Sequence, residues 1–210
     1  MNRTQKPQAR SEDRIARASK KLSWLLRHGA ATEGLDVDPA GWVPIDDVLK
    51  HSRLSRAQLD EVVRLNNKSR LQVDGARIRA CQGHSLAEMP VDLDALEASW
   101  RVWPGTGTVW HGTSIDAVPQ IAREGLRPGA RTHVHLAPAL DSGVGKRANV
   151  HVLLEVDPAR LRAAGIELWE AQNGVVLARH VPPACIIAVR AETHRARQAE
   201  PWRAFDLPGR

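Results

Sequence analysis

The spacing of apolar residues changes near residue 90 and divides this 210-residue sequence into two halves with different expected secondary structure. The first half places apolar residues at helical spacing, whereas the second half has short apolar runs separated by Gly, Pro and Asp. Between the two halves, the segment AEMPVDLDALEASW is acidic and contains a proline, which is typical of a connecting segment. A chain of this length can hold two small domains. The sequence therefore predicts an α+β protein with a helical N-terminal lobe and a strand-rich C-terminal lobe.

The first half predicts three helices followed by a β-hairpin. IARASKKLSWLLRHG carries apolar residues at helical spacing and ends at Gly29, a residue typical of helix C-caps. Two aspartates favour a helix beginning at IDDVLKHS, and Ser55 is expected to cap RAQLDEVVRLNN. SRLQVDGARIRACQ then contains Asp74-Gly75 between two β-prone runs, which is a strong hairpin signal. This order is typical of a winged helix, although an unrelated small α+β domain has the same elements.

The second half predicts a β-rich lobe. Strands are expected in TVWHGT, HVHLA, VHVLLEV, GVVLA and CIIAV, and one helix is expected in SIDAVPQIAREG. The predicted organisation is a basic flexible tail over residues 1–18, a winged-helix lobe over 19–88, a linker over 89–100, a β-rich lobe over 101–192 and a loose tail over 193–210.

Positive charge is concentrated at the N-terminus. The chain has a formal net charge of +6, and its first 21 residues hold seven Lys and Arg against two acidic residues. A basic segment binds polyanions such as nucleic acid through counterion release, but a solvated tail has the same composition.

The sequence also bounds the compartment in which the protein works. No apolar run is long enough for a membrane span, and the basic N-terminus lacks the apolar core of a secretory signal. We therefore expect a cytoplasmic protein without a membrane partner. Cys81 and Cys185 are too few for a disulfide framework and form no CxxC pair, so we expect free thiols.

Two basic groups in the first half are suited to binding phosphate. Arg27-His28 lies at the end of the first predicted helix, and Lys68-Ser69-Arg70 enters the hairpin, which carries Arg77 and Arg79 on its second strand. The planar guanidinium fork of arginine suits phosphate oxygens. Taken alone, the first pair is also typical of helix capping, and the second group is also typical of solvent-facing strand charge.

A further set of groups lies in the β-rich half. His111-Gly112-Thr113 closes the strand TVW, and its glycine permits a ligand to approach the backbone. His133 and His135 alternate on a strand, so both imidazoles are expected on one face, together with Arg131 if the strand begins there. No acidic residue or third His falls at an offset that completes a tetrahedral metal site. The chain also lacks a GxSxG elbow, a Walker A loop and a GxGxxG fingerprint, which argues against serine-hydrolase, P-loop and Rossmann chemistry.

Taken in order along the chain, eight segments resemble the NAD-dependent RNA (tRNA) 2'-phosphotransferase family. The most specific part is the combination of RACQGHS, HGT and RTHVHL, and the resemblance covers roughly residues 19–190. The segments are LSWLLRHGA (22–30), GLDVDPAGWVPIDDVL (34–49), NNKSRLQVD (66–74), IRACQGHS (78–85), WHGT (110–113), GLRPGARTHVHLA (125–137), GVGKR (143–147) and NGVVLARHVPP (173–183).

This resemblance implies a winged-helix lobe that faces RNA and an ADP-ribosyltransferase-like lobe of two small β-sheets that holds NAD, over residues 101–192. It implies removal of an internal RNA 2'-phosphate, as at a tRNA splice junction, by a monomer that consumes NAD as a co-substrate and needs no metal. The RNA 2'-phosphate would first attack the anomeric carbon of the nicotinamide ribose and expel nicotinamide. The neighbouring ribose hydroxyl would then attack the phosphorus, releasing RNA with a free 2'-hydroxyl and ADP-ribose 1'',2''-cyclic phosphate.

The resemblance also assigns site residues. The family's four essential residues, Arg-His-Arg-Arg, fall on Arg27, His28, Arg70 and Arg131, which would neutralise and orient the phosphate. The positions expected to contact NAD are His111, Gly112, Thr113, Ser114, His133, His135, Asn173 and Gly174. The positions expected to contact RNA are Lys68, Arg79, Gln82 and His84. For Gln82 and His84, a role as structural polar groups fits the sequence equally well.

The chain departs from the family pattern outside the Arg and His set. Asn67, Leu71, Trp110 and Val176 stand where Asp, Phe, Tyr and Trp are usual. Two other functions stay open. One is an ADP-ribosyltransferase that modifies terminal phosphates of nucleic acids, and the other is a non-catalytic winged-helix nucleic-acid binder, which leaves the clustering of histidines around Arg131 unexplained.

Overall fold

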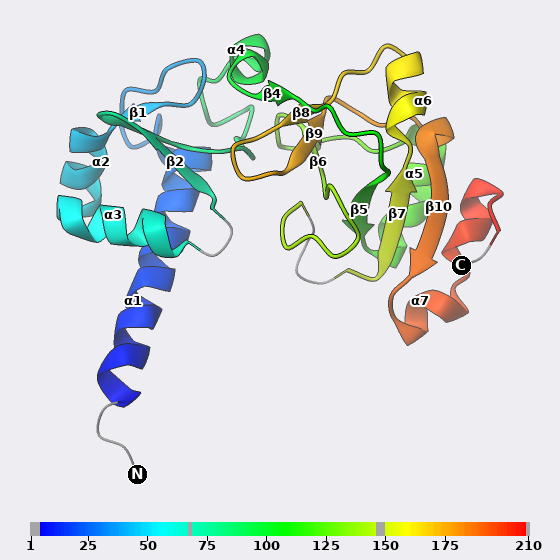
Figure 1. Ribbon diagram of the computed structural model, residues 1–210, viewed down its shortest axis with the longest axis horizontal. Coiled ribbons are helices and arrows are strands. Elements are labelled where there is room, and N and C mark those ends of the chain that lie inside the picture. The colour runs from blue at the N-terminus through cyan, green and yellow to red at the C-terminus, as the bar shows by residue number, and fades with distance from the viewer. Residues whose placement is uncertain (1–4, 67–68, 146–149, 209–210) are drawn as a thin grey trace. The chain divides into compact units, whose positions relative to one another are not determined.

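The computed structural model describes residues 5–66, 69–145 and 150–208, with side chains described from residue 13 onward (Figure 1). The chain divides into two compact units, Met1–Ser99 and Trp100–Arg210. Each unit has its own apolar core and combines helices with small antiparallel sheets, which confirms the predicted α+β class. The winged-helix and ADP-ribosyltransferase-like assignments stay predictions. No helix within the described ranges is long and apolar enough to cross a membrane.

The first unit begins with a long helix that ends in a π-helical turn. Its helical elements are α1 (Gln5–Trp24), η1 (Leu25–Gly29), α2 (Ile45–Ser52), α3 (Arg56–Leu65) and α4 (Leu93–Ala98). α2 has Asp46 and Asp47 in its first turn, and α3 begins with a capping box between Ser55 and Gln58. Both predicted helix starts are therefore confirmed. The core includes Leu22, Leu26, Val48, Leu59 and Ile78.

A three-stranded antiparallel sheet completes the first unit. Its order is β1-β3-β2, with bounds Val43–Pro44, Arg77–Ala80 and Leu71–Asp74 respectively. Asp74 pairs with Arg77, so the predicted hairpin is confirmed and its two turn residues are Gly75, at φ +57°, and Ala76. β1 was not predicted, because a two-residue strand shows no periodicity and depends on its pairing with a distant part of the chain.

The second unit contains two small antiparallel sheets. The sheet β10-β7-β5 is formed by Ile186–Ala191, Val152–Val156 and Val109–Thr113, and the sheet β4-β8-β9-β6 by Arg101–Val102, Trp169–Glu170, Val176–Ala178 and Val134–Leu136. Its helical elements are η2 (Ile115–Ala117), α5 (Val118–Glu124), α6 (Pro158–Ala163), η3 (Pro183–Cys185), α7 (His194–Gln198) and η4 (Pro201–Phe205). All five predicted strands are present as β5, β6, β7, β9 and β10, and the predicted helix is present as η2 and α5.

The two sheets of the second unit are joined where β5 passes the end of β6. Trp110 donates its backbone N–H to Ala137 O at 2.9 Å, and Ala137 donates its N–H to Trp110 O at 2.7 Å. Apolar side chains from both sheets fill one core, including Val109, Leu136 and Leu154. This junction places the residues of β5 beside those of β6.

The N-terminal segment and the linker differ from their predictions. α1 makes residues 5–24 helical and Ile15 joins the core, so a flexible tail over residues 1–18 is wrong for the described part of that segment. The predicted linker over residues 89–100 is also packed against the first unit. Met89 lies in the core of that unit, and Asp92 donates its backbone N–H to Pro39 O at 2.9 Å.

The C-terminal segment is not a loose tail either. α7 and η4 occupy most of residues 193–208, and the side chains of Trp202, Phe205 and Leu207 pack against the core of the second unit. The prediction of a loose tail followed from the polar composition of this segment. Its three apolar side chains are nevertheless enough to hold a short helical segment on an apolar surface.

Gly125 is expected to resist substitution for a steric reason. It caps α5 at φ +77° and ψ −171°, a backbone region used almost only by glycine, and a Cβ there would overlap Val181 O. We expect Gly125→Ala to destabilise the protein by at least about 2 kcal/mol. Gly129→Ala is the control, since Gly129 has φ +65° but open space at the Cβ position, and it should cost about 1 kcal/mol. Thermal unfolding followed by circular dichroism measures both, and equal losses would contradict the steric argument.

Candidate functional site

Arg27 and His28 lie on the π-helical turn that follows α1. Ala30 donates its backbone N–H to Leu25 O at 2.8 Å, which is the five-residue spacing of a π-helix, whereas the sequence predicted a regular α-helix. The wider turn changes the direction in which the side chains leave the helix, and such turns are frequent at functional sites. Both side chains are half-buried, and His28 Nδ1 lies 3.8 Å from Glu88 Oε2.

Arg70 and Arg27 are both tied to the segment that follows β3, residues 81–85. Cys81 donates its backbone N–H to Arg70 O at 2.9 Å, and Ser85 donates its backbone N–H to Arg27 O at 2.9 Å. β3 also packs against η1. Backbone hydrogen bonds therefore hold the main chain of both arginines against one short segment.

The Cys81 thiol adds a further restraint next to Arg70. Its Sγ donates to Ser69 O at 3.1 Å, and Ser69 adopts a left-handed conformation at φ +43°. Burial raises the pKa of Cys81 to about 11, although Arg79 and Arg27 oppose this shift, so the thiol keeps its proton at neutral pH and can donate it. Sequence analysis assigned no such role to Cys81, because only the folded chain places it beside Ser69.

His111, Arg131 and His135 come together in the second unit. His111 Nδ1 donates to the backbone oxygen of His135 at 3.0 Å, which links β5 to β6. A carbonyl oxygen only accepts, so Nδ1 carries a proton, and in the neutral form of the ring Nε2 is the acceptor. Arg131 Nη1 donates to His135 Nδ1 at 3.3 Å, which places the exposed guanidinium beside the half-buried imidazole.

His133 does not share this environment. β6 begins at Val134, and the His133 ring packs edge-on against the indoles of Trp100, at 4.9 Å between ring centroids, and Trp169, at 5.8 Å. The side chain of His133 is 1% exposed. Trp169 pairs with Leu177, and Leu177 pairs with His135, so the ring that contacts His133 lies on the same face of the sheet as His135. This register fits the expectation that the two imidazoles share one face, although His133 is much more deeply buried.

The other residues expected to contact NAD fall at two places in the second unit. Gly112 and Thr113 end β5 and Ser114 follows them, while Asn173 and Gly174 form the turn between β8 and β9. A Cβ on Gly112 would lie 2.6 Å from Val150 Cγ2, so the packing of this unit itself requires a glycine there. Their contacts with NAD stay predictions. Across the described ranges, no group of three or more His, Cys, Asp or Glu side chains could hold a metal ion.

Comparison with known proteins identifies the family. The family model described as "RNA 2'-phosphotransferase, Tpt1 / KptA family" matches residues 13–180. The chain belongs to this family. It is 41% identical over 175 residues to a "Probable RNA 2'-phosphotransferase" of Burkholderia lata, which covers 79% of this chain and 87% of the relative. Proteins of the same name from Pseudomonas fluorescens and Streptomyces griseus are 37% and 39% identical, over 83% and 82% of this chain and 97% and 95% of each relative.

Membership of this RNA 2'-phosphotransferase family confirms the resemblance found in the sequence. The matched range contains Arg27, His28 and Arg70 of the first unit as well as His111 and Arg131 of the second. It also contains all four residues that were expected to contact RNA, of which Arg79 has an environment that was not predicted.

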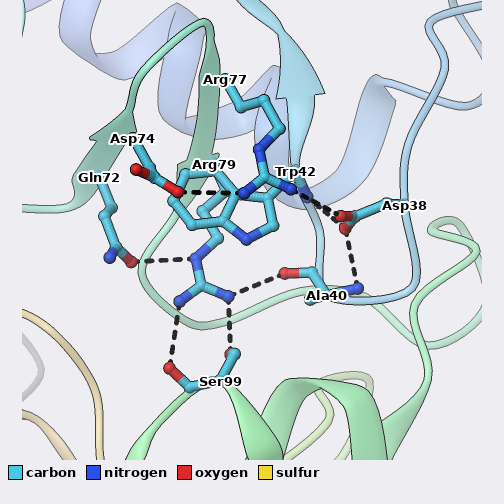
Figure 2. Close-up of polar contacts among 8 residues, drawn as sticks. All are labelled: Asp38, Ala40, Trp42, Gln72, Asp74, Arg77, Arg79 and Ser99. Carbon is cyan, nitrogen blue, oxygen red and sulfur yellow. Dashed lines mark hydrogen bonds and ion pairs between the residues drawn. The ribbon is translucent and has the colours of Figure 1, made fainter.

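Arg79 is a buried structural residue of this family member. Its side chain is 2% exposed and donates to Gln72 Oε1 at 3.0 Å, to Ala40 O at 3.0 Å and to Ser99 Oγ at 2.7 Å (Figure 2). Its guanidinium also lies 4.4 Å from the centre of the Trp42 ring. Burial lowers the pKa of Arg79 from its usual value. The prediction that Arg79 contacts RNA is contradicted, because its donors are used within the first unit.

The other residues expected to contact RNA have separate outcomes. His84 is fully buried, with its Nε2 2.6 Å from the position that a Cβ on Gly41 would take, and Gln82 is 7% exposed. These surroundings fit the structural role that the sequence left open for both residues. Lys68 lies outside the described residues.

Arg79 is expected to matter for folding rather than for RNA affinity alone. We expect Arg79→Ala to lower the free energy of unfolding by about 2–4 kcal/mol, because it leaves buried acceptors without a donor. Arg77→Ala is the control, since Arg77 is half-exposed, pairs with Asp74 at 3.0 Å and should contribute roughly 1 kcal/mol or less. Urea unfolding followed by tryptophan fluorescence compares the two. Equal stability of the wild type and Arg79→Ala would show that the buried network does not hold the unit together.

Proposed function

We propose that this protein is a transferase that removes an internal 2'-phosphate from RNA in an NAD-dependent reaction, by way of an ADP-ribosylated RNA 2'-phosphate. The observation that carries the proposal is the family match over residues 13–180, in which this chain keeps the Arg and His positions expected for that chemistry. The named relatives support a phosphotransferase that acts on RNA. We infer a tRNA-like RNA as substrate, bound by the winged-helix lobe, and an ADP-ribosyltransferase-like lobe for NAD.

The first unit would supply groups that bind the RNA 2'-phosphate. Arg27 and Arg70 present guanidinium groups from two elements that one segment, residues 81–85, holds in place through hydrogen bonds. Their fixed positions stabilise negative charge without the reorganisation that water would require. His28 would donate a proton to the departing ribose 2'-oxygen of the RNA.

The residues of the second unit fit a dinucleotide. The Arg131 guanidinium suits a phosphate oxygen, and His111 Nε2 suits a ribose hydroxyl, because the bond to His135 O fixes the proton on Nδ1. His135 accepts from Arg131 and limits the directions that its guanidinium can take. Bound NAD would supply the ribose carbon to which the RNA 2'-phosphate is transferred. Arg131 would then stabilise the charge that develops on the phosphoryl group.

A direct assay tests the proposed function. The protein is incubated with an oligoribonucleotide that carries one internal 2'-phosphate, with and without NAD. We expect loss of the 2'-phosphate and release of nicotinamide only with NAD, measured by mass spectrometry of both products. ADP-ribose attached to a terminal phosphate, with the internal 2'-phosphate retained, would instead indicate the alternative transferase activity. No reaction under either condition would leave a nucleic-acid binder.

Arg131 is expected to act mainly after the RNA has become ADP-ribosylated. Arg131→Ala should therefore slow release of the final RNA about 100-fold or more, while the ADP-ribosylated RNA accumulates. Arg127→Ala is the matched control, since Arg127 is an exposed arginine four residues earlier, and it should react as the wild type does. Rapid-quench sampling and denaturing gels resolve the three RNA species. Normal turnover in Arg131→Ala, without accumulation, would remove Arg131 from the site.

A further inference from the structure

The outer face of α1 carries a continuous line of cations that ends in a tryptophan. Arg14, Arg17, Lys21 and Trp24 follow one another at spacings of three, four and three residues, which places them on one side of the helix. All four side chains are exposed. We call these four residues the α1 stripe.

The opposite face of α1 is buried, so the stripe cannot be the polar side of a membrane-binding helix. Ile15, Leu22 and, in the following turn, Leu26 belong to the apolar core of the first unit. An amphipathic helix binds a lipid surface through its apolar face. On α1 that face is already covered by the fold, and only the cationic face is available.

The cations of the α1 stripe are not balanced by neighbouring carboxylates. Within the described part of the chain, Arg14, Arg17 and Lys21 form no ion pair, and Arg17 donates only to the backbone oxygen of Asp13, at 3.2 Å. Exposed cations on the next two helices differ in this respect. Lys50 pairs with Asp47 at 3.2 Å, and Arg56 pairs with Asp60 at 2.9 Å. A row of uncompensated cations favours a polyanion.

Trp24 is unusual among the seven tryptophans, all of which lie in the described part of the chain. Its side chain is 53% exposed, whereas Trp42, Trp100, Trp103, Trp110 and Trp169 are each 8% exposed and Trp202 is partly buried. The Trp24 ring lies against Gly29, with Cζ3 2.6 Å from the position of a Cβ there. An exposed indole held in one orientation offers a stacking surface for a nucleobase.

We propose that the α1 stripe binds the single-stranded RNA that flanks the 2'-phosphate, with Arg14, Arg17 and Lys21 on backbone phosphates and Trp24 stacked on a base. This inference rests on the proposed function for the identity of the RNA. From Arg14 to Trp24 the stripe is about 15 Å long, from the helical rise of 1.5 Å per residue. A stripe of this length spans only a few consecutive phosphates of one strand, which fits its three cations. The chain continues from Trp24 directly into η1, which carries Arg27 and His28.

Binding measurements with long and short RNA test the proposal. The full-length protein is titrated, without NAD, into a fluorescent single-stranded oligoribonucleotide of about 20 nucleotides with a central 2'-phosphate, and into a 2'-phosphorylated dinucleotide. Arg14→Gln/Arg17→Gln/Lys21→Gln should bind the long RNA at least ten-fold more weakly and lower the slope of log Kd against log salt by about 2, because three phosphate contacts are lost. Its affinity for the dinucleotide should change less than two-fold.

Trp24 is tested separately from the charges. Trp24→Ala should weaken binding of the long RNA roughly ten-fold, as expected for one lost stacking contact, with the salt slope unchanged. Trp24→Phe keeps an aromatic ring and should recover most of that loss. A purely structural role of Trp24 would not produce this difference in RNA affinity between Trp24→Ala and Trp24→Phe. Thermal unfolding checks that each variant remains folded.

A charge-matched variant controls for the general effect of removing three cations. Lys50→Gln/Arg56→Gln/Arg123→Gln removes the same charge at exposed positions that pair with Asp47, Asp60 and Glu124. It should bind the long RNA within two-fold of the wild type. Equal weakening by this variant and by the stripe variant would overturn the proposal in favour of non-specific attraction.

Two further outcomes would overturn the proposal. One is unchanged affinity of the stripe variant for the long RNA. The other is a stripe variant that loses binding to vesicles rich in phosphatidylserine but keeps RNA binding, which would assign the stripe to a membrane. These measurements record RNA binding without NAD and do not depend on catalysis. If the protein does not remove the 2'-phosphate, the proposed function is refuted, and the effect of the stripe substitutions on RNA binding can still be interpreted.

Discussion

Backbone hydrogen bonds from one short segment restrain two of the site arginines in the first unit. Residues 81–85 follow the strand β3, and backbone N–H groups of this segment donate to the backbone oxygens of Arg27 and Arg70. The neutral Cys81 thiol fixes the preceding peptide at Ser69. None of these bonds involves a guanidinium group. The fold therefore fixes the backbone positions of both arginines without using their guanidinium groups for these bonds.

The second unit uses the same principle with histidines. A backbone oxygen of β6 determines which nitrogen of His111 carries the proton, and the side chain of His135 accepts from Arg131. The first interaction spans the junction of the two small sheets, where Trp110 and Ala137 exchange backbone hydrogen bonds. A change at this junction would therefore alter the orientation and tautomer of the ring as well as its position.

Local signals in the sequence predicted the elements that are fixed by their own residues. The aspartates of α2, the capping box of α3 and the Gly75 turn are examples, since each depends on neighbours within a few residues. Long-range packing decided what was missed. The alternation of His133 and His135 indicated one shared face, but it could not show that Trp100 and Trp169 bury the first ring. Arg79 looked like an exposed wing arginine, yet every described residue of β3 after Arg77 is buried. The π-helical turn under Arg27 also left no trace in the spacing of apolar residues.

The packed C-terminal segment has a consequence for how the chain is made. The first unit ends at Ser99, so all the residues of its core are synthesised before those of the second unit. The second unit differs, because part of its core is covered by Trp202, Phe205 and Leu207, which follow its last strand in the chain. Domains generally fold as units during synthesis. The first unit can thus begin to fold while the second is still being synthesised, whereas the β-rich half acquires this apolar cover only once the residues that follow β10 have been made.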